Sequence, residues 1–236
     1  MNIPKSLTPS PVVEATVEIR FQSKFPPDAV IGIVYSIYQD VKLEGLPILQ
    51  IPAEIRRQDS NLKYKPTHKF MLREYTVQIG GDVILLSSPI DYPGWENYKN
   101  VLRELLEKLK SINLIQQIEY TSLKYLSFFQ DCNIFDHIKM NISFDQGKIN
   151  YPGTALKTEL QNEDYINVLQ IMNNVHLKNY KTDADGSLID IVCVAPRNNL
   201  QIEKIRAIID TAHNKEKELF FSLVDKNYLQ QFNPQY

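Results

Sequence analysis

Residues 13–21 read VEATVEIRF, in which apolar and polar side chains alternate at every step. Successive side chains of an extended strand point to opposite faces of its sheet, so this alternation predicts a strand with one buried and one solvated face. The polar residues Glu14, Thr16, Glu18 and Arg20 share the solvated face. The preceding residues, 1–11, contain three prolines without periodicity and are predicted to form an extended leader.

The pattern between this strand and residue 112 predicts a first α+β half. Residues 26–28, Pro-Pro-Asp, are typical of a helix start, and apolar residues at helical spacing follow as far as Val41. A hairpin signal, Gly-Gly-Asp, lies at 80–82. An amphipathic helix is predicted from Trp95 to Ile112. Strands are expected at 48–55, 69–73, 75–79 and 83–87.

From residue 118 the order of elements repeats. A long strand is expected at 118–129 and a short helical turn at 133–137. A turn is expected at 182–186, TDADG, and a long helix after Pro196. Each half therefore reads strand, helix, four strands, helix, with similar junctions at 85–89 (LLSSP) and 192–196 (VCVAP). The further strands of this half are expected at 138–144, 154–160, 165–176 and 187–194.

The predicted fold class is α+β, with two similar halves sharing a curved, mostly antiparallel sheet and helices packed on one face. The expected boundaries are a leader at 1–11, a first half at 12–112, a second half at 117–225 and a tail at 226–236. A single integrated domain over 12–225 is the alternative.

Composition excludes several classes of protein. The 236 residues are 43% hydrophobic and 23% charged, which is typical of a globular chain, and the net charge of −2 gives no global attraction for nucleic acid or membrane. No secretion signal or membrane span is expected, which favours the cytoplasm. The two cysteines, Cys132 and Cys193, are too few for a disulfide framework and are expected to pack as small core residues.

Three segments resemble an uncharacterised, sporadically distributed family of bacterial proteins of similar length. They are PVVEATVEIRF at 11–21, YPGWENY at 92–98, and the C-terminal helix with His213 followed by Phe220 and Phe221. The strand around Lys124 and Ser127 is similar to a family stretch that usually carries Arg and Asn at these places. The resemblance supports the boundaries of the fold and implies no reaction.

The order of elements also resembles the duplicated architecture of the TATA-box binding protein. That resemblance implies a DNA-binding saddle, but the net charge of the chain argues against it.

The chain lacks the motifs of most enzyme classes. It has only 8 glycines and no phosphate-binding loop or nucleophile elbow, so no cofactor is expected. The four histidines have no metal-ligand spacing, and the loop at 183–190 lacks the end ligands of a calcium site. Asp210, His213 and Glu216 have a spacing of three on the last helix, which allows a general base or a metal site. The alternative is a solvated charged helix face.

Surface recognition is the remaining function. A basic segment contains Arg56, Arg57, Lys69 and Arg73 interleaved with aromatic residues, so it is able to bind a nucleic acid, or it is a charged sheet edge. Trp95, at a helix start, either caps the core or stacks on a ligand. The polar face of Glu14, Glu18 and Arg20 would line a concave surface suited to a protein partner or to self-association. We therefore expect a non-enzymatic binding module, with nucleic-acid binding and His213 catalysis as alternatives.

Overall fold

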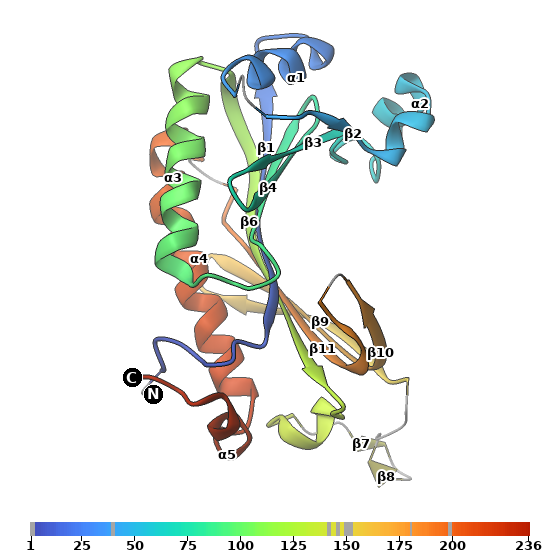
Figure 1. Ribbon diagram of the computed structural model, residues 1–236, viewed down its shortest axis with the longest axis vertical. Helices are drawn as coiled ribbons and strands as arrows, with labels where there is room; N and C mark the ends of the chain where they lie inside the picture. The colour runs from blue at the N-terminus through green and yellow to red at the C-terminus, as the bar shows by residue number, and fades with distance from the viewer. Residues whose placement is uncertain are drawn as a thin grey trace.

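The computed structural model describes residues 3–38, 41–140, 143–144, 147–148, 153–179, 181–197 and 200–236. One curved antiparallel sheet of nine strands, in the order β2-β3-β4-β5-β1-β6-β11-β10-β9, runs through the molecule. Figure 1 shows the two long helices α3 and α4 on one side of this sheet. The predicted α+β fold class is confirmed.

The first half runs from β1 to α3. Its strands are β1 (Val12–Ser23), β2 (Glu44–Gly45), β3 (His68–Leu72), β4 (Tyr75–Ile79) and β5 (Val83–Ser87). Its helices are α1 (Pro27–Ser36), α2 (Ala53–Gln58) and α3 (Trp95–Ser111), with a 3-10 turn at Pro47–Gln50. The predicted strand at 13–21 and the helix from Trp95 are both present because each has an uninterrupted pattern of apolar residues at its own period.

The second half runs from β6 to the C-terminus. Its strands are β6 (Ile115–Gln130), β7 (Ser143–Phe144), β8 (Gly147–Lys148), β9 (Ala155–Asn162), β10 (Tyr165–Lys178) and β11 (Asp183–Val194). Strands β7 and β8 form a separate pair. Helix α4 (Ile202–Leu223) is followed by α5 (Lys226–Leu229), and 3-10 turns lie at Ile134–His137 and Gln230–Phe232. No helix among the described residues is long and apolar enough to cross a membrane.

The strand order is symmetrical about the central pair of β1 and β6. On one side of this pair follow β5, β4 and β3, and on the other follow β11, β10 and β9. The two central strands are antiparallel over most of their length, from the pairing of Val12 with Ser127 to that of Ser23 with Ile115. The two halves therefore share one continuous sheet.

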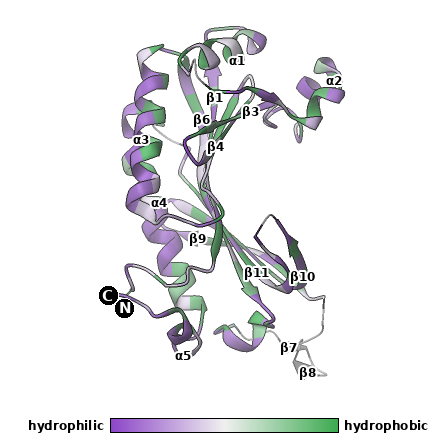
Figure 2. Cartoon of the chain, in the orientation of Figure 1, coloured by the Kyte–Doolittle hydropathy of each residue, from purple (hydrophilic) through white to green (hydrophobic). Residues whose placement is uncertain are grey.

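The main core lies between the sheet and the helices. The alternate residues Ala15, Val17, Ile19 and Phe21 of β1 are all buried, as the sequence pattern predicts. Helix α3 contributes Tyr98, Leu102 and four further buried residues to the same layer. Figure 2 shows hydrophobic residues running along the central strands, whereas the side of α3 away from the sheet is largely hydrophilic. Apolar burial of this kind stabilises a fold by about 25 cal/mol per Å².

Three predicted elements are wrong. The expected strand at 48–55 is instead a 3-10 turn and helix α2, because Pro47 and Pro52 cannot donate to a strand ladder and suit helix starts. The expected turn at 182–186 lies earlier, where Asn179 N–H donates to Thr182 O, and residues 183–186 belong to β11. Helix α1 ends at Ser36 and does not reach Val41. The strand expected at 138–144 falls partly outside the described residues; Ser143 and Phe144 form β7.

Candidate binding surfaces and a buried polar cluster

The residues singled out by the sequence lie in different parts of the molecule. The structure brings some of them together on the sheet face that α3 and α4 leave uncovered, which we call the uncovered face, and others around a cationic pocket or in a buried aromatic cluster. The uncovered face holds Glu14, Glu18 and Arg20; the cationic pocket holds Arg56 and Arg57; the aromatic cluster holds Trp95 and His213; and Lys69 and Arg73 lie outside the pocket.

The charges at the centre of the uncovered face form a connected set. Glu14 accepts a hydrogen bond from the Thr16 hydroxyl at 2.8 Å and lies 3.5 Å from the Lys124 ammonium. Lys124 lies 3.9 Å from Asp190 on β11. Burial raises the pKa of Asp190, and its Oδ1 has no hydrogen-bond partner within the described part of the chain. Opposite charges therefore alternate across three neighbouring strands.

Arg20 is held by its neighbours on the uncovered face. Its guanidinium lies 2.6 Å from Glu18 and stacks between the rings of Tyr64 and Tyr120, at 4.7 and 4.3 Å from their centroids. A guanidinium between two aromatic faces is stabilised by the ring quadrupoles. Arg20 is therefore positioned to fix the segment around Tyr64 over the sheet, and its charge is already paired.

The second half contributes an apolar strip to the uncovered face. The pairing of β6, β11 and β10 places Lys124 opposite Val192 and Val192 opposite Val168. Since alternate residues share a face, the neighbours two positions away lie on it as well. These side chains are only half-buried, although most are β-branched or aliphatic. The strip consists of Leu126, Ile166, Val168, Met172, Val192 and Val194.

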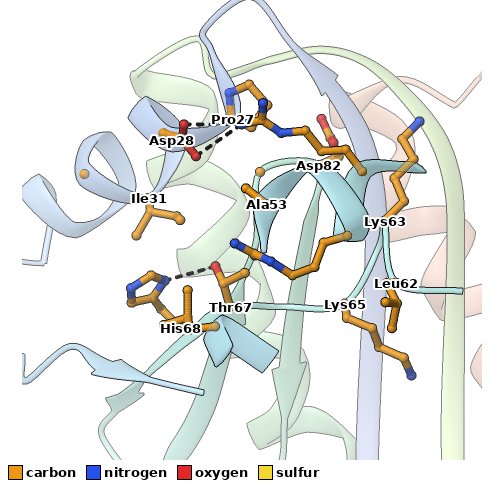
Figure 3. A pocket seen from close by; sticks show the side chains of 15 residues that line it. Pro27, Asp28, Ile31, Ala53, Leu62, Lys63, Lys65, Thr67, His68 and Asp82 are labelled. Atoms are coloured by element: carbon orange, nitrogen blue, oxygen red, sulfur yellow. Dashed lines mark hydrogen bonds and ion pairs between the residues drawn. The ribbon is translucent and has the colours of Figure 1, made fainter. Parts of the chain in front are cut away.

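A cationic pocket of about 550 Å³ lies between α1, α2 and the start of β3. Figure 3 shows Lys63, Lys65 and His68 around it, with Asp28 and Asp82 also on its wall. Arg56 and Arg57 complete the set of basic residues. This pocket brings Arg56 and Arg57 of the predicted basic segment together with Lys63, Lys65 and His68, but it includes neither Lys69 nor Arg73.

The charges of the pocket are only partly compensated. Arg57 lies 3.2 Å from Asp28, and Arg56 donates through Nε to Ile51 O at 3.0 Å. The pKa of His68 is lowered by burial and by Arg56, so this imidazole is neutral near pH 7. Burial raises the pKa of Asp82, while the charge of Lys63 acts to lower it. An anion is therefore the ligand that these walls favour.

Lys69 and Arg73 do not join the pocket. Lys69 lies 3.5 Å from Glu44 on the neighbouring strand, and Arg73 lies 2.7 Å from Glu104 on α3. Lys69 lies on β3 and Arg73 in the turn after it. Lys69 therefore contacts the neighbouring strand β2, and Arg73 contacts α3. They were grouped with Arg56 in the prediction because they are close to it in the sequence, but closeness in sequence does not determine distance in the folded chain.

Trp95 and His213 form a stack in the layer between the sheet and α4. Their ring centroids lie 4.1 Å apart, and Tyr98 stacks on Trp95. His213 Nδ1 is 3.0 Å from the Tyr125 hydroxyl, which is 2.9 Å from the Tyr92 hydroxyl. Trp95 is half-buried and packs against the core, where it contacts the hydrogen-bonded side chains of His213, Tyr125 and Tyr92 through its stack on His213.

His213 does not form the predicted pair with Asp210. Asp210 lies 3.7 Å from Lys99 on α3, and within the described residues it makes no hydrogen bond or ion pair with the imidazole. Burial, together with Lys217 and Lys99, lowers the pKa of His213 to about 3. An imidazole this hard to protonate is a poor general base near neutral pH, since catalytic efficiency is highest when the pKa matches the working pH.

Glu216 is buried and lies one helical turn from His213 on α4. Its side chain lines a cavity of about 90 Å³ together with Tyr92, Tyr125 and His213. Burial raises the pKa of Glu216 to about 8. The solvated helix face considered above is therefore wrong for His213 and Glu216, which are 9% and 5% exposed. The spacing of three residues between His213 and Glu216 predicts that they share a face of the helix, but it does not show whether that face is buried.

Neither cysteine has the environment of a reactive thiol. Burial raises the pKa of Cys193 to about 12 and also raises the pKa of Cys132. A thiol in such surroundings stays protonated and is a weak nucleophile. Among the described residues, no group of three or more histidine, cysteine, aspartate or glutamate side chains is arranged to hold a metal ion.

Comparison with protein families and with curated proteins finds no match to this chain.

Proposed function

We propose that this chain is a non-enzymatic binding protein whose uncovered face receives a protein partner. The observation that carries the proposal is the half-buried apolar strip on β6, β11 and β10, on the side of the sheet away from α3 and α4 (Figure 1). A contiguous exposed apolar surface bordered by polar residues is typical of an interaction site. The charged residues Glu14, Lys124 and Asp190 border the strip, so a partner with complementary charges would bind in one defined position.

The chemistry of the uncovered face favours a polypeptide over DNA. Glu14, Glu18 and Asp190 would lie against the phosphates of a nucleic acid, whereas a protein surface offers basic groups for them. The net charge of −2 supplies no compensating attraction. The proposed partner is therefore a protein that presents apolar side chains beside basic ones.

We expect Val192→Glu to abolish capture of the partner. The substitution places a charge at the centre of the apolar strip, opposite Lys124, while the backbone pairing of β11 is retained. Tagged wild-type chain isolated from its native host should bring down a stoichiometric partner, quantified by mass spectrometry. Ile55→Glu, an equal change at the exposed α2, should leave capture intact.

Two outcomes would contradict this proposal. One is recovery of the bare wild-type chain at native abundance. The other is equal capture by wild type and Val192→Glu. Light scattering of the purified chain distinguishes self-association from a separate partner, because a self-associating chain forms its complex without the host extract.

A second candidate function is binding of a polyanion, such as a nucleic acid, through the cationic pocket. The specific observation is that Arg56, Arg57, Lys63 and Lys65 gather around one pocket with only two acids on its wall. Backbone phosphates are recognised by such clusters without regard to base sequence. Tyr64 does not line this pocket, and Arg20 and Lys63 already contact its ring, so contacts to phosphates would carry the binding.

We expect the double variant Arg56→Ala/Lys65→Ala to weaken oligonucleotide binding about tenfold and to reduce the salt slope by about two. Lys69→Ala/Arg73→Ala removes the same charge from residues already paired with Glu44 and Glu104, so it is the matched control. Fluorescence anisotropy with single- and double-stranded oligonucleotides over a salt series measures both. Absence of any binding by the wild type at low salt would remove this candidate.

We also propose that the two halves arose by internal duplication. The symmetrical strand order about β1 and β6 supports this. The TATA-binding-like topology and the bacterial origin implied by resemblance stand as proposals beside it.

A further inference from the structure

A small cavity, separate from both proposed binding surfaces, lies where α4 meets the N-terminal segment. Its volume is about 90 Å³, which is room for a few non-hydrogen atoms. Tyr92, Tyr125 and His213 line one side, and residues 5–7 and 10–12 line the other. The N-terminal segment is also tied to the C-terminal tail, since Thr8 N–H donates to Phe232 O at 2.6 Å.

The carboxyl group of Glu216 is the unusual feature of this cavity. Glu216 is 5% exposed, lines the cavity, and has no hydrogen bond or ion pair within the described part of the chain. A buried carboxylate without a partner is strongly disfavoured, because it loses its hydration and gains nothing in return. The charge of Lys217 acts to lower the pKa of this carboxyl but forms no ion pair with it within the described residues, so a proton or a further positively charged ligand is needed to satisfy the group.

The other walls favour a cation of organic character. Phenol rings from Tyr92 and Tyr125 and phenyl rings from Phe220 and Phe221 surround the space. The faces of aromatic rings attract ammonium groups, and the same rings accept alkyl carbons. The phenol oxygens of Tyr92 and Tyr125 are further acceptors beside Glu216.

We propose that this cavity binds a small alkylammonium cation, with Glu216 as its counter-ion and the tyrosine and phenylalanine rings as its walls. The inference is independent of the proposed binding of a protein partner, since the cavity lies on the helix side of the sheet. A ligand at this site would bridge α4 to the N-terminal segment. The chemistry is non-covalent, and the step that accompanies binding is release of the proton from Glu216.

Binding should therefore strengthen as the pH rises toward and beyond 8. The pKa of Glu216, raised by burial to about 8, means that at pH 7 the cation must displace a proton. The other groups that face the cavity change charge outside this range or oppose the ligand at all pH values near neutrality. The pKa of His213 is about 3, burial raises the pKa values of Tyr92 and Tyr125 and lowers that of Lys217, and the side chain of Lys5 also lines the cavity.

The test is a titration of the whole chain with ethylammonium chloride, read by the fluorescence of Trp95. This is the only tryptophan, and it stacks on His213 beside the cavity. Sodium chloride at equal ionic strength and ethanol, the neutral analogue, are the reference titrations. We expect saturable binding of ethylammonium alone, stronger at pH 8.5 than at pH 7, with proton release measured by calorimetry in two buffers.

Variants separate this proposal from a structural effect. Glu216→Gln keeps the shape of the side chain and should weaken ethylammonium binding about tenfold or more. Glu218→Gln, an exposed residue on the same helix, should leave it unchanged. Circular dichroism establishes that both variants fold. Equal binding by Glu216→Gln, equal effects of ethanol or sodium, or no saturable signal at pH 8.5 would each overturn the proposal.

Discussion

Replacement of Tyr98 by phenylalanine is expected to lower the free energy of unfolding by about 3 kcal/mol. The buried Tyr98 hydroxyl donates to Leu86 O at 2.6 Å and accepts from Val17 N–H at 2.9 Å. Val17 and Leu86 are facing residues of β1 and β5, so the phenol joins α3 to both strands at one point. Phenylalanine would leave a buried donor and a buried acceptor without partners.

Urea denaturation followed by circular dichroism measures this effect. Tyr75→Phe is the matched control, because Tyr75 is buried nearby and its hydroxyl has no hydrogen bond within the described residues. We expect the control to lose well under half as much stability as Tyr98→Phe. Equal stability losses in the two variants would contradict the bridging role of Tyr98.

Elements with an unbroken apolar period were predictable from the sequence. The alternation at 13–21 became β1, and the helical stripe from Trp95 became α3. Both patterns are long enough for burial of one face to outweigh local preferences. The hairpin signal at 80–82 was also predictive, because a short turn joins antiparallel neighbours such as β4 and β5.

Short segments were not predictable, because local chemistry competes with the period. Residues 48–55 are apolar enough for a strand, yet Pro47 and Pro52 begin a 3-10 turn and a helix. Residues 183–186 resemble a turn in composition, yet they pair with β10 and extend β11. In residues 183–186 the structure is decided by pairing with a different strand. In residues 48–55 it is decided by two prolines, which are compatible with the end of a strand as well as with the start of a helix.

The candidate sites were predictable only in part. The basic residues from Arg56 to His68 do share a pocket, because α2 and the following turns fold back over a short stretch of chain. The cavity at Glu216 brings together residues 5–7 and 10–12, Tyr92, Tyr125 and α4, which come from well-separated parts of the sequence. The spacing of Glu216 from His213 is visible in the sequence, but the burial that raises the pKa of Glu216 depends on tertiary packing.

The stability of the chain is expected to fall on both sides of a maximum between about pH 5 and 6.5, because of His213 and Glu216. The folded-state pKa of His213 is about 3, below its ordinary 6.5, so unfolding takes up a proton and stability is lost as the pH falls below 6.5. The folded-state pKa of Glu216 is about 8, above its ordinary 4.5, so unfolding releases a proton and stability is lost as the pH rises toward 8.

The alkaline side isolates Glu216. Above about pH 7 His213 is largely neutral in both states, so its contribution is nearly constant, and the slope that Glu216 contributes is about 1.4 kcal/mol per pH unit or less. Above about pH 9 the carboxyl group is ionised in both states and this contribution is constant. Glu216→Gln has no charge to bury, so we expect it to remove the slope and to exceed the wild type at pH 8.5 by on the order of 4 kcal/mol.

Urea denaturation at closely spaced pH values from 5 to 9, for wild type and for Glu216→Gln, measures the difference directly. Other titrating groups are common to both proteins, so subtraction of the two curves leaves the contribution of Glu216. Glu218→Gln, at an exposed position of the same helix, should retain the wild-type slope. A difference curve that is flat between pH 6.5 and 8 would mean that the Glu216 carboxyl is solvated or paired in the folded chain. That result would also remove the unpaired charge from which the ammonium site is inferred.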